Sequence, residues 1–248
     1  MTVKGLFITG TDTDAGKTVV TAALLRCLRE DLQIDAVPAK PVQTGASRWP
    51  DGGEWRAPDL QECLDGAGLM PDDEEMRLMA PFCYEHPCSP HLAGRLEGGA
   101  PTVAGIVAAL RQLEHRHACV VAEGAGGILV PLNDQETMLD LAKALKYPVV
   151  VVVRNALGCI NHGLLTLRIL QAAHVNVLGV VMNTTLPPTL GTDLIRRDNP
   201  ETIARFSGMP ILGAVPFLAP DGHGRRRWNT LAADAPVLLE CLKHLCKP

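Results

Sequence analysis

The chain has 248 residues, of which 47% are hydrophobic and 20% are charged, and its formal net charge is −4. A chain of this length can bury a substantial core. This composition excludes a disordered chain and argues against a basic nucleic-acid-binding protein. No apolar run approaches the roughly 18 residues of a membrane helix, and no signal-peptide core precedes the first strand pattern. We therefore expect a cytoplasmic globular protein that binds neither nucleic acid nor membrane and keeps its cysteines reduced.

Strand and helix patterns alternate along most of the chain. Apolar runs predict strands over residues 6–9, 36–40, 119–122, 149–153, 177–183 and 211–215. Helical spacing of apolar residues predicts helices over residues 17–31, 103–115, 138–145, 161–174 and 236–246. This alternation predicts an α/β fold with one doubly wound, mostly parallel sheet and helices on both faces. In such sheets ligands bind at the carboxyl ends of strands, where Gly10, Lys40, Glu123 and Asn183 fall.

Residues 41–101 interrupt the alternation. They are rich in proline and glycine and show only weak helical patterns. Long irregular segments inside compact domains are usually functional loops. We therefore interpret this stretch as a loop-rich insertion that supplies lid and substrate loops within one domain spanning residues 1–248.

A phosphate-binding loop is the strongest motif. Residues 10–18 read GTDTDAGKT, follow a predicted strand and open a predicted helix, which is the context that such a loop requires. Backbone N–H groups and the helix N-terminus would bind phosphates, Lys17 would reach the β- and γ-phosphates, and Thr18 would bind Mg²⁺. Five residues separate Gly10 from Gly16, one more than in the ordinary motif. We expect a wider loop on a fold of the P-loop NTPase type.

A second lysine and an acid also fall at strand ends. Lys40 stands between Pro38 and Pro41, where a cation would stabilise charge on a transferred phosphoryl group. Glu123 follows an apolar strand, where phosphate-loop enzymes keep a carboxylate for the metal, and a glycine-rich stretch follows it. The sequence alone does not place Asp59, because it lies in the irregular insertion.

Several of these features together resemble a known family. They are residues 10–18, 40–42, 89–91, 123–127 and 158–162, and Asn183. With them, residues 3–218 look like a dethiobiotin synthetase. The resemblance implies an ATP- and Mg²⁺-dependent ligase of biotin biosynthesis that closes a ureido ring from 7,8-diaminopelargonic acid and CO₂. It also implies a carbamate, then a carbamic–phosphoric mixed anhydride, and a homodimer with its site at the subunit interface.

The resemblance also implies a role for each matching residue. Lys17 and Lys40 would be catalytic, and Thr18, Asp59 and Glu123 would hold Mg²⁺. Substrate would contact Thr44, Ser89 and the helix start at Gly158, Cys159, Ile160 and Asn161, the last four from the neighbouring subunit. The remaining ATP contacts would be Thr13, Asp14, Ala15, Gly16, Val19, Gly124, Ala125, Gly126, Asn183, Thr184, Pro216, Phe217 and Leu218.

The chain departs from the family's sequence pattern at two positions. Thr184 stands where some family members have Asp, and His223 falls near a nucleotide-contacting Glu, so the strictness for ATP stays open.

Three alternative interpretations of the sequence also remain. A partition-type switch ATPase shares this kind of sheet but carries a lysine inside residues 11–13, where this chain has none. An amide- or cobalamin-type ligase would need a glutaminase region. A zinc site at Cys83, His86, Cys88 and His91 has a spacing that matches no common zinc motif.

Overall fold

A parallel six-stranded sheet forms the centre of the protein in a computed structural model that describes residues 4–48, 55–187 and 192–218. The strand order is β10-β9-β8-β1-β7-β2. The strands are β1 (Gly5–Gly10), β2 (Ala36–Ala39), β7 (Cys119–Gly127), β8 (Val149–Arg154), β9 (Val177–Asn183) and β10 (Ile211–Val215). All neighbouring pairs run parallel. The predicted fold class is thus confirmed, and the sheet strands match the predicted runs closely.

Helices cover both faces of this sheet, as the continuous apolar strands require. Val149, Val151 and Val153 pack into one core with α5 (Val103–Arg116), α6 (Met138–Leu145) and α7 (Cys159–Ala172). Val150 and Val152 pack into a second core with α1 (Lys17–Arg26). Successive side chains of β8 point to opposite faces of the sheet. Because both faces are covered, every valine of β8 is fully buried.

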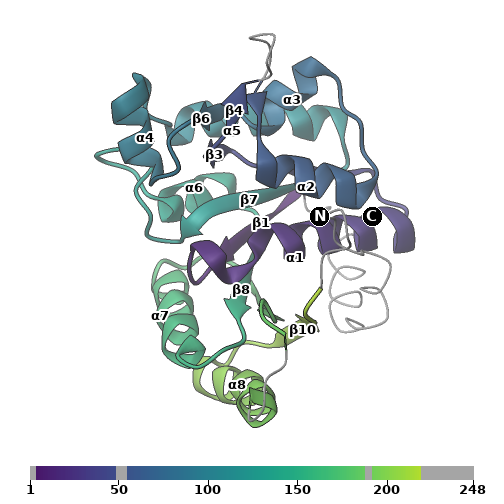
Figure 1. Cartoon of the computed structure of the whole chain (residues 1–248), viewed down its shortest axis with the longest axis vertical. Helices are drawn as coiled ribbons and strands as arrows, with labels where there is room; N and C mark the ends of the chain where they lie inside the picture. The colour runs from purple at the N-terminus through teal and green to yellow at the C-terminus, as the bar shows by residue number, and fades with distance from the viewer. Residues whose placement is uncertain (1–3, 49–54, 188–191, 219–248) are drawn as a thin grey trace.

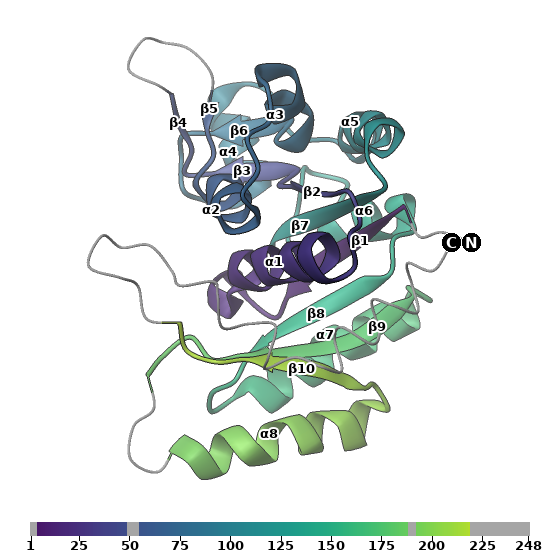
Figure 2. The ribbon, with the colours of Figure 1, turned by 90° about the vertical axis from the view of Figure 1, so that its right-hand side faces the viewer.

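The insertion 41–101 contains more regular structure than its sequence predicts. It holds α2 (Pro58–Ala67), α3 (Asp73–Met79) and α4 (Pro90–Glu97), with short strands β3 (Val42–Thr44), β4 (Ser47–Arg48), β5 (Trp55–Arg56) and β6 (Phe82–Tyr84). Figure 1 shows these elements gathered at the end of the sheet opposite β10, and Figure 2, which labels β2, shows that this is the β2 end. Pro58 and Pro90 do not interrupt helices but start them, because the first helical position needs no N–H donor.

Two other helices differ from the prediction, and one was missed. The helix predicted over residues 17–31 ends as α1 at Arg26 and continues as a π turn over Cys27–Asp31, whereas α7 begins two residues before the predicted start at 161. Helix α8 (Thr192–Ser207) was not predicted, because it is polar and contains Pro200. It lies at the β10 end of the molecule (Figure 2).

Two predictions fall beyond Leu218, the helix over residues 236–246 and the place of His223, and both lie outside the described residues. Within the described ranges, no helix is both long and apolar enough to cross a membrane.

Candidate functional site

The phosphate loop lies between β1 and α1, as the motif predicts. A 3-10 turn over Thr13–Ala15 takes up its extra length, and the Asp12 carboxylate accepts a hydrogen bond of 2.7 Å from the Thr13 N–H. Gly16 has φ +84°, and a Cβ there would lie 1.9 Å from Asn183 Nδ2. Only glycine therefore fits this position, because both the backbone conformation and the space require it.

The side chain of Asn183 links the phosphate loop to the end of β9. Asn183 ends β9, is 2% exposed, and donates from Nδ2 to the carbonyl oxygen of Ala15 at 2.9 Å. The side chain predicted to read the nucleotide base thus also supports the phosphate loop.

The ammonium group of Lys17 curls back over the loop. It donates to the carbonyl oxygens of Asp12 at 2.9 Å and Thr13 at 3.2 Å, and the residue is buried. Burial and the nearby charge of Lys40 lower the pKa of Lys17 to about 8, although Glu123 and other carboxylates act in the opposite direction. A buried cation at the helix N-terminus is placed to attract phosphate oxygens.

Lys40 lies in a buried cluster with two carboxylates. It follows β2, and its Nζ lies 2.6 Å from Glu123 Oε1 and 2.8 Å from Asp59 Oδ2. Burial disfavours the charged form of Lys40, but the charges of Glu123 and Asp59 prevail and raise its pKa above the ordinary value. For Asp59, burial acts to raise the pKa, but Lys40 reverses this effect and lowers it. Lys40 and Asp59 therefore both stay ionised near neutral pH.

Three oxygen-bearing side chains, those of Thr18, Asp59 and Glu123, meet beside Lys40. Thr18 donates from Oγ1 to Glu123 Oε1 at 3.0 Å, and Asp59 reaches the same group of atoms from the first turn of α2. A hydroxyl and two carboxylates are the hard donors that Mg²⁺ prefers, with substrate phosphates completing its shell. The described residues contain no group of three or more His, Cys, Asp or Glu side chains that could hold a metal ion.

Most predicted site residues line one cavity of about 730 Å³. Those predicted and present are Thr13, Asp14, Gly16, Lys17, Thr18, Val19, Lys40, Thr44, Asp59, Ser89, Glu123, Ala125, Gly126, Asn183, Thr184, Pro216 and Leu218. Ala15 and Gly124 lie behind the lining and contact it through their carbonyl oxygens, with that of Gly124 3.5 Å from Lys40 Nζ. Phe217 does not line the cavity; it lies between two residues that do.

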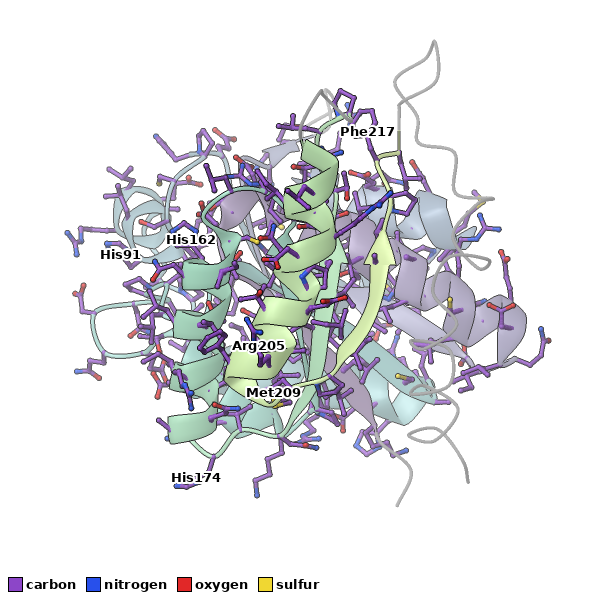
Figure 3. All side chains as sticks on the ribbon, turned by 90° about the horizontal axis from the view of Figure 1, so that it is seen from below. His91, His162, His174, Arg205, Met209 and Phe217 are labelled. Carbon is purple, nitrogen blue, oxygen red and sulfur yellow. The ribbon has the colours of Figure 1, made fainter. Side chains whose placement is uncertain are left out.

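The four residues at the start of α7 do not join this cavity. Gly158 and Asn161 are exposed, whereas Cys159 is buried and Ile160 is half-buried. Figure 3 shows His162, in the first turn of α7, toward the end of the molecule that carries Phe217, and His174 at the opposite end. The start of α7 therefore faces outward at the carboxyl end of the sheet.

Sequence reasoning missed several lining residues, among them Gln43, Glu62, Pro87 and Cys88. Gln43 lies between two predicted residues, and its Oε1 accepts from the Asp59 N–H at 3.2 Å, which positions α2. Cys88 adjoins the predicted Ser89. In both cases adjacency in sequence was the available signal.

The cysteine–histidine stretch does not form a cluster. His86 Nδ1 pairs with Glu97 Oε1 at 2.8 Å, and Cys83 donates to the carbonyl oxygen of Ala80 at 3.5 Å. Cys88 lines the cavity instead.

The buried cluster yields a stability prediction. Lys40→Met leaves the Glu123 carboxylate buried without its ammonium partner, so we expect the free energy of unfolding to fall by about 3 kcal/mol. Adding Glu123→Gln removes that uncompensated charge and should restore at least half of the loss. Urea unfolding measures both values, with Lys143→Met on the exposed side of α6 as the control. Equal losses in the single and double variants would contradict the assigned pairing.

Known proteins resemble this chain closely. The family described as an AAA domain matches residues 4–221. The ATP-dependent dethiobiotin synthetase BioD of Anoxybacillus flavithermus is 37% identical over 228 residues, which cover 92% of this chain and 98% of that protein. The protein of the same name from Anaeromyxobacter sp. strain K is 40% identical over 225 residues, which cover 91% and 95%.

Solved structures show the same fold. The septum site-determining protein MinD of Pyrococcus horikoshii, complexed with Mg-ADP, has a TM-score of 0.51 at 16% identity, covering 86% of this chain and 80% of that one. The MinC:MinD complex of Aquifex aeolicus gives 0.53 at 14% identity, with coverages of 86% and 80%. At such identities the likeness concerns the fold alone, whereas the sequence relatives span almost the whole chain at much higher identity. The chain therefore belongs to the ATP-dependent dethiobiotin synthetase family.

Proposed function

We propose that this protein closes the ureido ring of dethiobiotin from 7,8-diaminopelargonic acid and CO₂, converting ATP to ADP and phosphate with Mg²⁺. The observation that carries the proposal is the Lys40–Asp59–Glu123 cluster beside the phosphate loop. Sequence relatives named as dethiobiotin synthetases support it. We also propose that residues 1–248 act as one ligase domain, since the insertion contributes Thr44, Asp59 and Ser89 to the same cavity.

The phosphate loop would hold the triphosphate. Backbone N–H groups of residues 13–19 and the ammonium of Lys17 would face the β- and γ-phosphates at the start of α1. Thr18, Asp59 and Glu123 would hold Mg²⁺, which neutralises phosphate charge when bound. Glu123, Gly124, Ala125 and Gly126 would form the wall next to the phosphates.

Lys40 would position the reacting groups. The two carboxylates keep its ammonium charged, so it can attract the carbamate and the γ-phosphate together. Thr44 and Ser89 line the same cavity on the insertion side and would contact the diamine. Bringing anionic groups to one cation and fixing their orientation is the main contribution that this site can make.

The proposed reaction has three steps. One substrate amine adds to CO₂ and loses a proton, which gives a carbamate. A carbamate oxygen attacks the γ-phosphorus, and the bond to ADP breaks, which gives the carbamic–phosphoric mixed anhydride. The second amine attacks the carbonyl carbon, loses a proton and expels phosphate, which closes the ring.

The base of ATP would lie at the other end of the cavity. Asn183, Thr184, Pro216 and Leu218 line the cavity where β9 and β10 end, and Phe217 lies between the last two. The Thr184 N–H donates to the Val215 carbonyl oxygen at 2.9 Å, which joins the ends of β9 and β10 under the base.

The start of α7 supports a homodimer with shared sites. Gly158, Cys159, Ile160 and Asn161 open a 14-residue helix at an exposed position, and Leu157 beside them is 87% exposed. A helix N-terminus attracts carboxylates. We propose that it binds the distal carboxylate of the diamine held in the neighbouring subunit.

The first test measures phosphate release from Mg·ATP with and without the diamine and bicarbonate. Release should require both additions. Asp59→Asn should raise the Mg²⁺ concentration for half-maximal rate about tenfold, because it removes a ligand charge. Asp65→Asn, exposed on the same helix, serves as the control. ATP turnover indifferent to the diamine would reject the ligase and favour a switch ATPase.

The shared site predicts complementation between two inactive variants. Lys40→Met disables the catalytic half, and Asn161→Asp places a negative charge where the carboxylate should bind. After denaturation and refolding of an equal mixture, half of the dimers carry one intact site, so about a quarter of wild-type activity should return. The separately refolded variants are the control. A mixture no more active than their average would contradict a site built from two subunits.

A further inference from the structure

Pro200 leaves an acceptor open in the middle of α8. Proline has no N–H, so the carbonyl oxygen of Arg196, four residues earlier, lacks its usual helical donor. Asn155 fills this position, because its Nδ2 donates to the Arg196 carbonyl oxygen at 3.0 Å. The Oδ1 atom of Asn155 accepts from Asn199 Nδ2 at 2.8 Å. Asn155 and Asn199 are only 8% and 4% exposed, so the two amides form a buried polar junction.

This junction attaches α8 to the carboxyl end of the sheet. Asn155 directly follows β8, and its backbone N–H donates to the carbonyl oxygen of Asn183 at 2.8 Å. Asn183 ends the neighbouring strand β9 and lines the cavity. One residue thus contacts both the helix carbonyl and the strand end at which the base would bind.

The side chain of Arg196 extends from the same helical turn to the segment after β9. Its Nη2 donates to the carbonyl oxygens of Leu186 at 3.0 Å and Pro187 at 3.2 Å. The two residues before them, Thr184 and Thr185, line the cavity. Hydrogen bonds from a guanidinium are charge-assisted. Because the planar Arg196 group donates to two successive carbonyl oxygens, it restricts the segment from the end of β9 to Pro187.

We propose that Pro200, Asn155 and Arg196 form a unit that holds residues 184–187 in place, and that Asn155 and Arg196 are positioning residues for the nucleotide base. Pro200 opens the carbonyl, Asn155 anchors the helix there, and Arg196 fixes the loop. The inference rests on the proposed binding of ATP in this cavity. It assigns Arg196 a role at the base end, because its side chain donates to Leu186 and Pro187 and not to Asn183, which supports the phosphate loop.

That separation can be measured by comparing ADP with inorganic triphosphate. Arg196→Ala frees residues 184–187. Part of the binding free energy of the base would then be used to order them, so we expect ADP affinity to fall about tenfold. The affinity for inorganic triphosphate should not change, because it would contact the phosphate loop, Lys40 and residues 123–126 but not the segment that Arg196 holds. Arg196→Lys should recover part of the loss. Arg197→Ala, exposed on the next position of α8, is the matched control.

A variant that weakens both ligands equally, or neither, would overturn the proposal. The readout is calorimetric binding and not turnover. Failure of the protein to close the ring would therefore reject the proposed function, while a selective loss of ADP affinity would still support the role of Arg196.

A double-mutant cycle tests the part played by Pro200. Asn155→Ala in the natural background leaves the Arg196 carbonyl without a donor, and we expect ADP affinity to fall about fivefold. Pro200→Ala restores the N–H of residue 200, so the same Asn155→Ala change should cost less than half as much on a logarithmic scale. The lost contact to Asn199 is common to both backgrounds and cancels. An equal cost in both backgrounds would show that Asn155 does not act through the open carbonyl.

Discussion

The site depends on the ion pairs that the buried ammonium group of Lys40 makes with Glu123 and Asp59. An isolated charge at the end of β2 would be costly to bury, so Glu123 from β7 and Asp59 from α2 must approach it closely. Glu123 in turn accepts from Thr18 at the start of α1. The Cys63 thiol lies 3.9 Å from Glu123 Oε2, and burial together with the Glu123 charge raises its pKa far above the usual range, so it stays a neutral neighbour. Compensation of one charge thus brings four elements together.

The positions of these residues follow from the topology of the sheet. Parallel strands place their carboxyl ends at one edge of the sheet. At this edge the cavity is lined by Lys40 just after β2, Glu123 within β7 and Asn183 at the end of β9, and the phosphate loop follows β1. The sequence was sufficient to predict this edge, because the runs before Gly10, Lys40, Glu123 and Asn183 are apolar and short. The loop over residues 10–18 was predictable for a similar reason, since its glycines and lysine stand between a strand pattern and a helix pattern.

Contacts across the insertion could not be predicted in this way. Asp59 reaches Lys40 only because Pro58 starts a helix, and a proline in a short polar stretch looks like a break in structure. Pro200 in α8 misled the prediction similarly, because the donor that compensates for it, Asn155, is 45 residues earlier in the chain. Local patterns carry no record of such distant partners. The role proposed for the α7 start would depend on a second subunit, so that a single chain would contain only half of the arrangement.

The proposed reaction joins the carbamate and the γ-phosphate in this cavity through a shared oxygen. Bicarbonate labelled with ¹⁸O, supplied with the diamine and Mg·ATP in a single turnover, tests it directly when the released phosphate is analysed by mass spectrometry. We expect one labelled oxygen to pass from the carbon source into each phosphate, because the carbamate oxygen would remain on phosphorus when the ring closes. Phosphate without label, formed alongside dethiobiotin, would contradict the mixed anhydride and the role assigned to Lys40.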